Sequence, residues 1–198
     1  MIDRKAFFAG VRQGPFPGKL SAGQVNGITA ILDEWDRRKL SDPRCLAYML
    51  GTTKWETDHT MQPIREAGGV AYLTRNYDPF GSRPALAKRN GNTQAGDGVK
   101  YCGRGYVQLT WKNNYRAMGK LIGQPLEESP DLAMRPDIAA QVMFEGMSRG
   151  SFTGKKLTDY FTASQTDWLG ARRIINGTDR AADIASIAKQ FYADLCAA

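Results

Sequence analysis

The sequence predicts a mostly helical α+β protein in which a small, irregular sheet lobe interrupts two sets of helices. Apolar residues recur with helical spacing in the first and last parts of the chain. Between them, residues 61–106 concentrate glycine and proline, which favours turns and irregular backbone. We therefore expect one domain over residues 1–198. Its helical lobe comprises residues 1–60 and 111–198, its small β-containing lobe covers about 61–110, and a cleft separates the lobes.

The first helices carry clear start signals. Ser21 and Gln24 form a capping-box pattern ahead of an amphipathic segment that should run to about Lys39. Asp42-Pro43 supplies a cap and a first-turn proline for the next helix. This second helix should end near Trp55-Glu56.

The remaining elements follow from the same rules. Short extended pieces fit residues 70–74 and 100–109, which gives the small sheet. Apolar periodicity predicts further helices over 111–122, from Pro136 onward, around 167–175 and over 182–197.

The cysteines and the histidine limit the kinds of catalytic or metal site that the chain can form. An odd number of widely spaced cysteines (Cys45, Cys102 and Cys196) argues against a disulfide framework and suggests a reducing compartment. The single histidine, His59, leaves no recognisable spacing for a zinc site and only a weak basis for nucleophilic catalysis. Any chemistry should therefore depend on carboxylates.

Charge and hydropathy indicate which classes of partner the protein can bind. The 198 residues carry a net charge of +7, with Lys and Arg scattered along the chain. Nucleic-acid binding would need one concentrated basic face, whereas scattered charge suits a polyanionic surface such as a bacterial wall or simply solubility. No apolar run reaches the roughly 20 residues that span a bilayer, and no secretory h-region follows the N-terminus. We expect no nucleic-acid partner and no integral membrane segment.

Two acids are candidates for glycoside hydrolysis, which pairs a protonated carboxylic acid with a carboxylate that activates water or attacks the sugar. Glu56 ends the second helix beside Trp55, and Glu66 begins the glycine-rich segment. Spacing alone does not separate such a pair from solvated surface acids. Asp58 is an alternative base, although its place two residues after Glu56 favours another face. His59 fits either a catalytic partner or a surface group.

The run from Tyr101 to Tyr115 holds neutral polar side chains suited to sugar hydroxyls or a bound water. Glycines flank Arg104, which can orient a carboxylate or form a structural ion pair. Tyr106 and Trp111 can stack on sugar rings or fill the core. The polar candidates are Gln108, Thr110 and Asn114.

These residues together resemble glycoside hydrolase family 19, and most closely its single-domain, chitinase-like phage and prophage endolysins. The resemblance rests on the Glu56 helix end, Arg65-Glu66, Gly-Arg-Gly-Tyr-Val-Gln-Leu-Thr and Ile174-Ile175-Asn176-Gly177, over about residues 44–195. It implies a lysozyme-like, two-lobed fold that hydrolyses β-1,4 bonds between amino sugars.

The resemblance also implies roles for individual residues. Glu56 would be the general acid, Glu66 the base of an inverting attack and Thr110 a ligand of the attacking water. The implied substrate contacts are Gln108, Asn114 and Asn176, to which we add Tyr106 and Arg104. Inversion would hold the two carboxyl groups roughly 6.5–9.5 Å apart.

Two departures from the plant chitinases matter. Trp55 stands where those enzymes usually have histidine, and the chain lacks their cysteine pairs and secretory peptide. Related lysozyme-like endolysins pair Glu with another acid and a threonine, which keeps Thr74 as a lesser candidate.

The sequence therefore predicts a muramidase- or lysozyme-type endolysin that cleaves the glycan strand of peptidoglycan, without a metal or organic cofactor. A chitinase is the first alternative and a non-catalytic glycan-binding module the second. We expect a monomer that is made in the host cytoplasm and acts at the bacterial cell wall after release.

Overall fold

The computed structural model describes residues 2–198, which divide into two compact units. Unit 1 contains the chain up to Gln62 together with Met143–Ala198, and unit 2 contains Pro63–Val142. Unit 2 extends past the expected end of the β-containing lobe at about residue 110. The reason is local packing, because the Tyr115 hydroxyl, beyond that end, donates to the Cys102 carbonyl within the glycine-rich segment at 2.8 Å.

Unit 1 is built from helices. Its elements are α1 (Arg4–Val11), α2 (Ala22–Arg38), α3 (Pro43–Glu56), the 3-10 helices η2 (Leu157–Asp159) and η3 (Gly170–Ile174), and α9 (Ala181–Cys196). Helix α8 (Pro136–Arg149) begins in unit 2 and ends in unit 1. The segment around 167–175, expected as a regular helix, forms only the short 3-10 turn of η3.

The capping signals behave as the sequence predicts. Ser21 and Gln24 form both bonds of a capping box at the start of α2, and Asp42 accepts from the Arg44 amide ahead of α3. Each bond satisfies an amide that the first turn of a helix leaves free. The position of Glu56 at the end of α3 follows from where this helix starts and stops.

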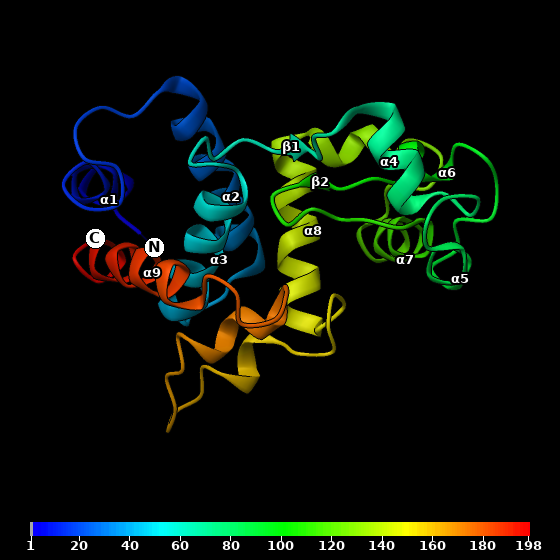
Figure 1. The fold of residues 1–198 in the computed structure, drawn as a ribbon. Coiled ribbons are helices and arrows are strands. Elements are labelled where there is room, and N and C mark those ends of the chain that lie inside the picture. Colours follow the sequence, from blue (N-terminus) through cyan, green and yellow to red (C-terminus); the bar gives the residue numbers. More distant parts are fainter. Residues whose placement is uncertain (1) are drawn as a thin grey trace. The chain divides into compact units, whose positions relative to one another are not determined.

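The core of unit 1 lies where α3 meets α9, with α1 and α2 against the same pair (Figure 1). Gly51 of α3 has no side chain where a β-carbon would lie 3.0 Å from Ala188 of α9, so the helices approach closely. Phe7 and Phe191 stack in the same core, and both are fully buried. This packing fixes the helix that carries Glu56.

Unit 2 combines short helices with one two-stranded antiparallel sheet. Its elements are β1 (Ile64–Arg65), α4 (Gly69–Tyr77), α5 (Pro84–Arg89), α6 (Asp97–Lys100), β2 (Arg104–Gly105), α7 (Lys112–Ile122) and η1 (Pro130–Met134). The extended piece expected over 70–74 is wrong, because these residues lie in α4. Gly68 and Gly69 adopt positive φ angles that turn the chain into the helix, and Leu73 buries its side chain.

The sheet is smaller than expected. Strands β1 and β2 pair antiparallel, with Ile64 opposite Gly105 and Arg65 opposite Arg104. Only two residues of the expected strand over 100–109 belong to β2. The predicted fold class, mostly helical with a small irregular sheet, is confirmed.

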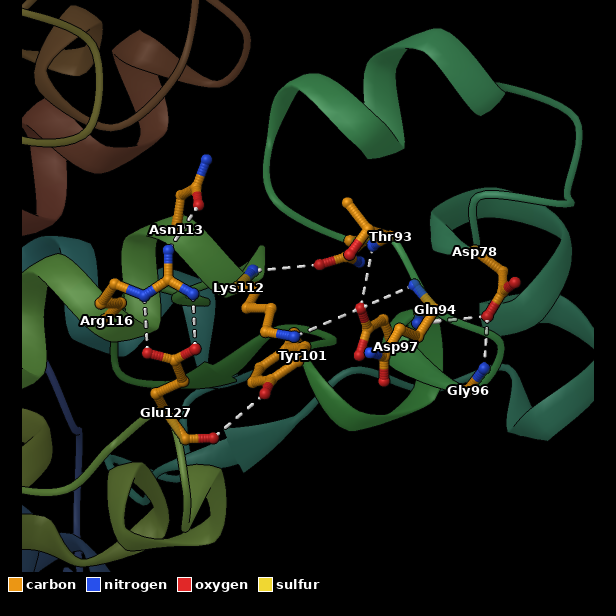
Figure 2. Close-up of polar contacts among 12 residues, drawn as sticks. Asp78, Thr93, Gln94, Gly96, Asp97, Tyr101, Lys112, Asn113, Arg116 and Glu127 are labelled. Carbon is orange, nitrogen blue, oxygen red and sulfur yellow. Dashed lines mark hydrogen bonds and ion pairs between the residues drawn. The ribbon is translucent and has the colours of Figure 1, made fainter.

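Two buried acids anchor the loop before α6 (Figure 2). Asp78 accepts from the Gly96 amide at 2.8 Å, and Asp97 accepts from the Thr93 and Gln94 amides at 2.9 and 3.1 Å. The Lys112 ammonium lies 3.6 Å from Asp97. These contacts tie the glycine-rich loop before α6 to both α4 and α7.

Within the described part of the chain, no helix combines the length and the apolar character needed to cross a membrane.

Candidate active site

Glu56, the last residue of α3, is held by a buried arginine of the same unit. Its Oε1 accepts from Nη1 of Arg172 in η3 at 2.6 Å, and the two side chains are 19% and 5% exposed. Nε of Arg172 donates to the Asp179 carbonyl at 3.0 Å, which fixes the guanidinium. Since Oε2 of Glu56 has no hydrogen-bond partner among residues 2–198, one oxygen is anchored and the other is available.

The turn after α3 separates Glu56 from the polar residues that follow it. Thr57 is buried, donates to the Thr53 carbonyl at 2.7 Å and accepts from the Met61 amide at 3.0 Å. Asp58 and His59 adopt positive φ angles and lie exposed. No hydrogen bond or ion pair joins the His59 imidazole to any residue in the described chain, so nothing there couples it to Glu56.

Glu66, directly after β1, is oriented by two donors within unit 2. The Tyr77 hydroxyl donates to its Oε1 at 2.6 Å, and the Gly103 amide donates to its Oε2 at 3.1 Å. Burial and the bond to Glu66 both raise the pKa of Tyr77, so its phenol stays protonated and remains a donor. The Tyr77 ring also packs edge-on against Trp111, with the ring centroids 5.0 Å apart. The carboxylate of Glu66 is therefore held in one orientation.

Three polar groups converge around Gly103. A β-carbon at this position would lie 2.7 Å from Oε1 of Gln108, 3.2 Å from Oε2 of Glu66 and 3.3 Å from Oγ1 of Thr110. The glycine thus provides the space in which the three oxygens lie close together. Of the predicted site residues, the structure brings these three into one cluster, which we call the Glu66 cluster.

The backbone contacts of the Glu66 cluster determine which atoms remain free. Nε2 of Gln108 donates to the carbonyls of Ile64 and Gly105 at 3.1 and 3.3 Å. The Thr110 hydroxyl donates to the Gln108 carbonyl at 2.8 Å, which leaves its oxygen able to accept from a water. Asn114 donates to the Thr110 carbonyl at 2.8 Å and so supports the cluster from α7.

Two predicted substrate contacts are buried in the structure. Tyr106 is fully buried. Arg104 is 3% exposed and bonds to Asp131 at 2.7 Å and to the Tyr115 hydroxyl at 3.2 Å. The Arg104 donors are thus paired within unit 2, as burial of a guanidinium requires.

The other candidates lie apart from the Glu66 cluster. Asn176 is exposed just after η3 in unit 1, and its Oδ1 accepts from the Gly177 amide at 2.9 Å. Thr74 lies inside α4, and no hydrogen bond connects its hydroxyl to Glu66 in the described structure. Among residues 2–198, no group of three or more His, Cys, Asp or Glu side chains is placed to hold a metal ion.

Two residues that hold the acids, Arg172 and Tyr77, are not among the residues predicted from the sequence. The only signal for Arg172 is its position just before Ile174-Ile175-Asn176-Gly177. For Tyr77, its place in an amphipathic segment soon after Glu66 gives a weaker hint.

Comparison with known proteins adds a family match. Residues 35–146, more than half of the chain, match the family model of glycosyl hydrolase family 19, described as chitinase class I. An endochitinase of Arabidopsis thaliana is 49% identical over 45 residues, which cover 22% of this chain and 16% of that protein. A glycosyl hydrolase family 19 domain-containing protein of Haemophilus influenzae is 42% identical over 52 residues, 26% of each. The matched segments thus span about a quarter or less of these relatives.

The fold is also similar to that of a solved structure. Chitinase C of Streptomyces griseus superposes with a TM-score of 0.62 at 21% identity, over 95% of this chain and 91% of that one. At this identity the likeness concerns the fold.

Proposed function

Because the chain belongs to glycoside hydrolase family 19, we propose that it hydrolyses β-1,4 glycosidic bonds of the bacterial peptidoglycan glycan strand, as an endolysin. The main support for this proposal is the geometry of the Glu66 cluster. It places a carboxylate with fixed orientation beside a threonine oxygen able to accept from water. Such a pair suits the activation of water for attack on an anomeric carbon.

In this proposal Glu56 is the general acid. Arg172 holds Oε1, and the free Oε2 would carry the proton that passes to the leaving glycosidic oxygen. Trp55, the preceding residue of α3, is half-buried. The Arg180 guanidinium lies 5.8 Å from the centre of the Trp55 ring and supports that side chain by a cation–π contact.

Glu66 is the proposed base. Its carboxylate would take a proton from a water that Thr110 binds, and the resulting hydroxide would attack the anomeric carbon with inversion. Tyr77 and the Gly103 amide hold the carboxylate during the transfer, so that little reorganisation is needed as the proton moves. Gln108, Asn114 and Asn176 would contact the sugars.

The proposal also states which polymer is hydrolysed. Peptidoglycan carries carboxylates on its stem peptides, and a chain with net charge +7 is attracted to such a polyanion. The second candidate is a chitinase, which the similarity to plant endochitinases favours. Both substrates contain β-1,4-linked N-acetylglucosamine, so the same two carboxyl groups would serve either reaction.

We also propose where the protein acts. It would be synthesised in the host cytoplasm, act as a monomer and reach the cell wall of the bacterium after release.

The proposal is tested by incubating purified peptidoglycan sacculi and colloidal chitin with wild type, Glu56→Gln, Glu66→Gln and the control Asp58→Asn. Release of reducing sugar from sacculi should exceed that from chitin. Each Glu→Gln change should lower it by about 10²-fold or more. Asp58→Asn should retain activity, because that carboxylate is exposed beyond the end of α3. Release from chitin alone would establish the chitinase, and equal activity of all variants would refute both assignments.

A further inference from the structure

A group of unpaired cations lies on one short segment of unit 2. Arg75, Arg83, Lys88 and Arg89 are all exposed, and the described chain gives none of their side chains an ion pair or hydrogen bond. Together with the residues between them, they define what we call the α4–α5 surface. Many exposed cations elsewhere do have acidic partners, as Arg116 does in Glu127 at 2.6 Å (Figure 2).

The acids near this surface are withdrawn from it. Asp78 and Asp97 are 2% and 6% exposed, and both accept hydrogen bonds from backbone amides. Between residues 67 and 96 the sequence contains no other acid. The local positive charge is therefore neutralised neither by neighbours in sequence nor by exposed carboxylates between the cations.

The backbone brings the cations onto one continuous piece of structure. The amide and hydroxyl of Ser82 both donate to the Arg75 carbonyl, at 2.7 and 2.9 Å. This turn connects the end of α4 to the start of α5, where Arg83 is the N-terminal flanking residue. Lys88 and Arg89 occupy the last turn of α5 (Figure 1).

The α4–α5 surface is linked to the Glu66 cluster through Tyr77. Tyr77 is the last residue of α4, two residues after Arg75, and its hydroxyl donates to Glu66 at 2.6 Å. The helix that carries Arg75 therefore also supplies the donor that orients Glu66.

We propose that the α4–α5 surface is a docking site for the carboxylates of the wall glycan, namely those of the peptides attached to alternate sugars. This inference rests on the proposed function and extends it, because it states how a charged glycan is distinguished from neutral chitin. Clustered, unpaired cations attract a polyanion and raise its local concentration, an effect that weakens as salt increases.

The apolar residues nearby do not favour a lipid bilayer as the partner. Val70, Tyr72 and Phe80 are exposed, at 68%, 41% and 74%. Val70 and Tyr72 are two residues apart on α4, so they point to different faces of the helix. Phe80 lies in the loop after it. An interfacial helix needs one continuous apolar face, which this segment lacks.

The test measures binding to purified sacculi in the Glu56→Gln background, which prevents digestion. A Lys88→Glu/Arg89→Glu variant is compared with a Lys19→Glu/Lys155→Glu control, which changes the net charge equally at exposed, unpaired lysines of unit 1. Circular dichroism of each variant verifies the fold. A second batch of sacculi has its carboxylates converted to neutral amides, and vesicles of phosphatidylglycerol serve as the lipid probe.

We expect the α5 variant to bind native sacculi about tenfold more weakly and the control to change less than twofold. The Glu56→Gln protein without further changes should bind amidated sacculi as weakly as the Lys88→Glu/Arg89→Glu variant binds native sacculi. Equal losses in both variants would overturn the proposal, since net charge alone would then explain binding. Vesicle binding stronger than sacculus binding and lost in the α5 variant would also overturn it.

Failure of the proposed function has a different signature. Reducing sugar would then be absent from sacculi treated with the protein carrying native Glu56, even where binding depends on Lys88 and Arg89. Failure of the docking proposal alone would leave hydrolysis intact and binding independent of the α5 cations.

Discussion

Replacing Gly103 with alanine should damage the Glu66 cluster while leaving the rest of unit 2 folded. The added β-carbon would lie 2.7 Å from Oε1 of Gln108, about 0.7 Å closer than an ordinary contact, and 3.2 Å from Oε2 of Glu66. Gln108 cannot withdraw freely, because its Nε2 is bonded to two backbone carbonyls. The carboxylate of Glu66 meets the same β-carbon and is held by Tyr77.

The expected losses of stability and of activity follow from these contacts. Overpacking and the loss of one or two hydrogen bonds should lower the free energy of unfolding by about 1–3 kcal/mol. For a chain of this length, such a loss corresponds to a fall in Tm of roughly 2–12 °C. Displacement of the proposed base by some tenths of an ångström up to 1 Å should lower kcat by as much as ~10²-fold.

The assay compares Gly103→Ala with Gly23→Ala, a helical glycine whose added β-carbon would make an ordinary 3.5 Å contact with Gln62. Thermal unfolding followed by circular dichroism gives Tm, and release of reducing ends gives kcat. The control should keep its activity within about twofold and its Tm unchanged or slightly raised. Wild-type activity in Gly103→Ala would contradict this role of Gly103, because the three oxygens would not then need the space at that position.

Three further predictions concern single side chains. Arg172→Lys keeps the charge but not the planar fork that bonds the acid and a backbone carbonyl, so kcat should fall about tenfold or more in steady-state hydrolysis; an unchanged kcat would contradict the role of this arginine. Tyr77→Phe removes the donor to the proposed base and should lower kcat about tenfold with KM within twofold, whereas a rise in KM alone would indicate a substrate contact instead. Burial raises the pKa of Cys45 to about 12, so at pH 8 only a ~10⁻⁴ fraction is thiolate. Peptide mass spectrometry after iodoacetamide treatment should find Cys196 modified and Cys45 intact, and equal modification of the two would contradict this assignment.

Local signals in the sequence were sufficient for helices α2, α3 and α9 of unit 1. Capping at Ser21 and Asp42 depends on residues within one turn, so the pattern alone locates α2 and α3 and therefore Glu56. The segment at 70–74 failed because Val70 and Thr74 favour strands by propensity. Here the tertiary burial of Leu73 and the two preceding glycines with positive φ decide for a helix.

The site residues could be predicted from the sequence only where they are close together in the chain. Gln108 and Thr110 lie in one motif with Gly103, and the structure places all three beside Glu66. Arg172 is 116 residues from Glu56, and no local pattern reports a contact over that distance. Tyr106 illustrates the same limit, because an aromatic in a polar run suits a sugar platform and a core equally well, and its burial depends on residues outside the run.

The most direct test of the account is to digest purified peptidoglycan with wild type and Glu56→Gln, reduce the products with borohydride and identify them by mass spectrometry. We expect disaccharide-peptides with new, reducible sugar ends from wild type and almost none from the variant. New free amines without new reducing ends would instead show amide cleavage and contradict the assignment of Glu56 and Glu66 as a glycosidase pair.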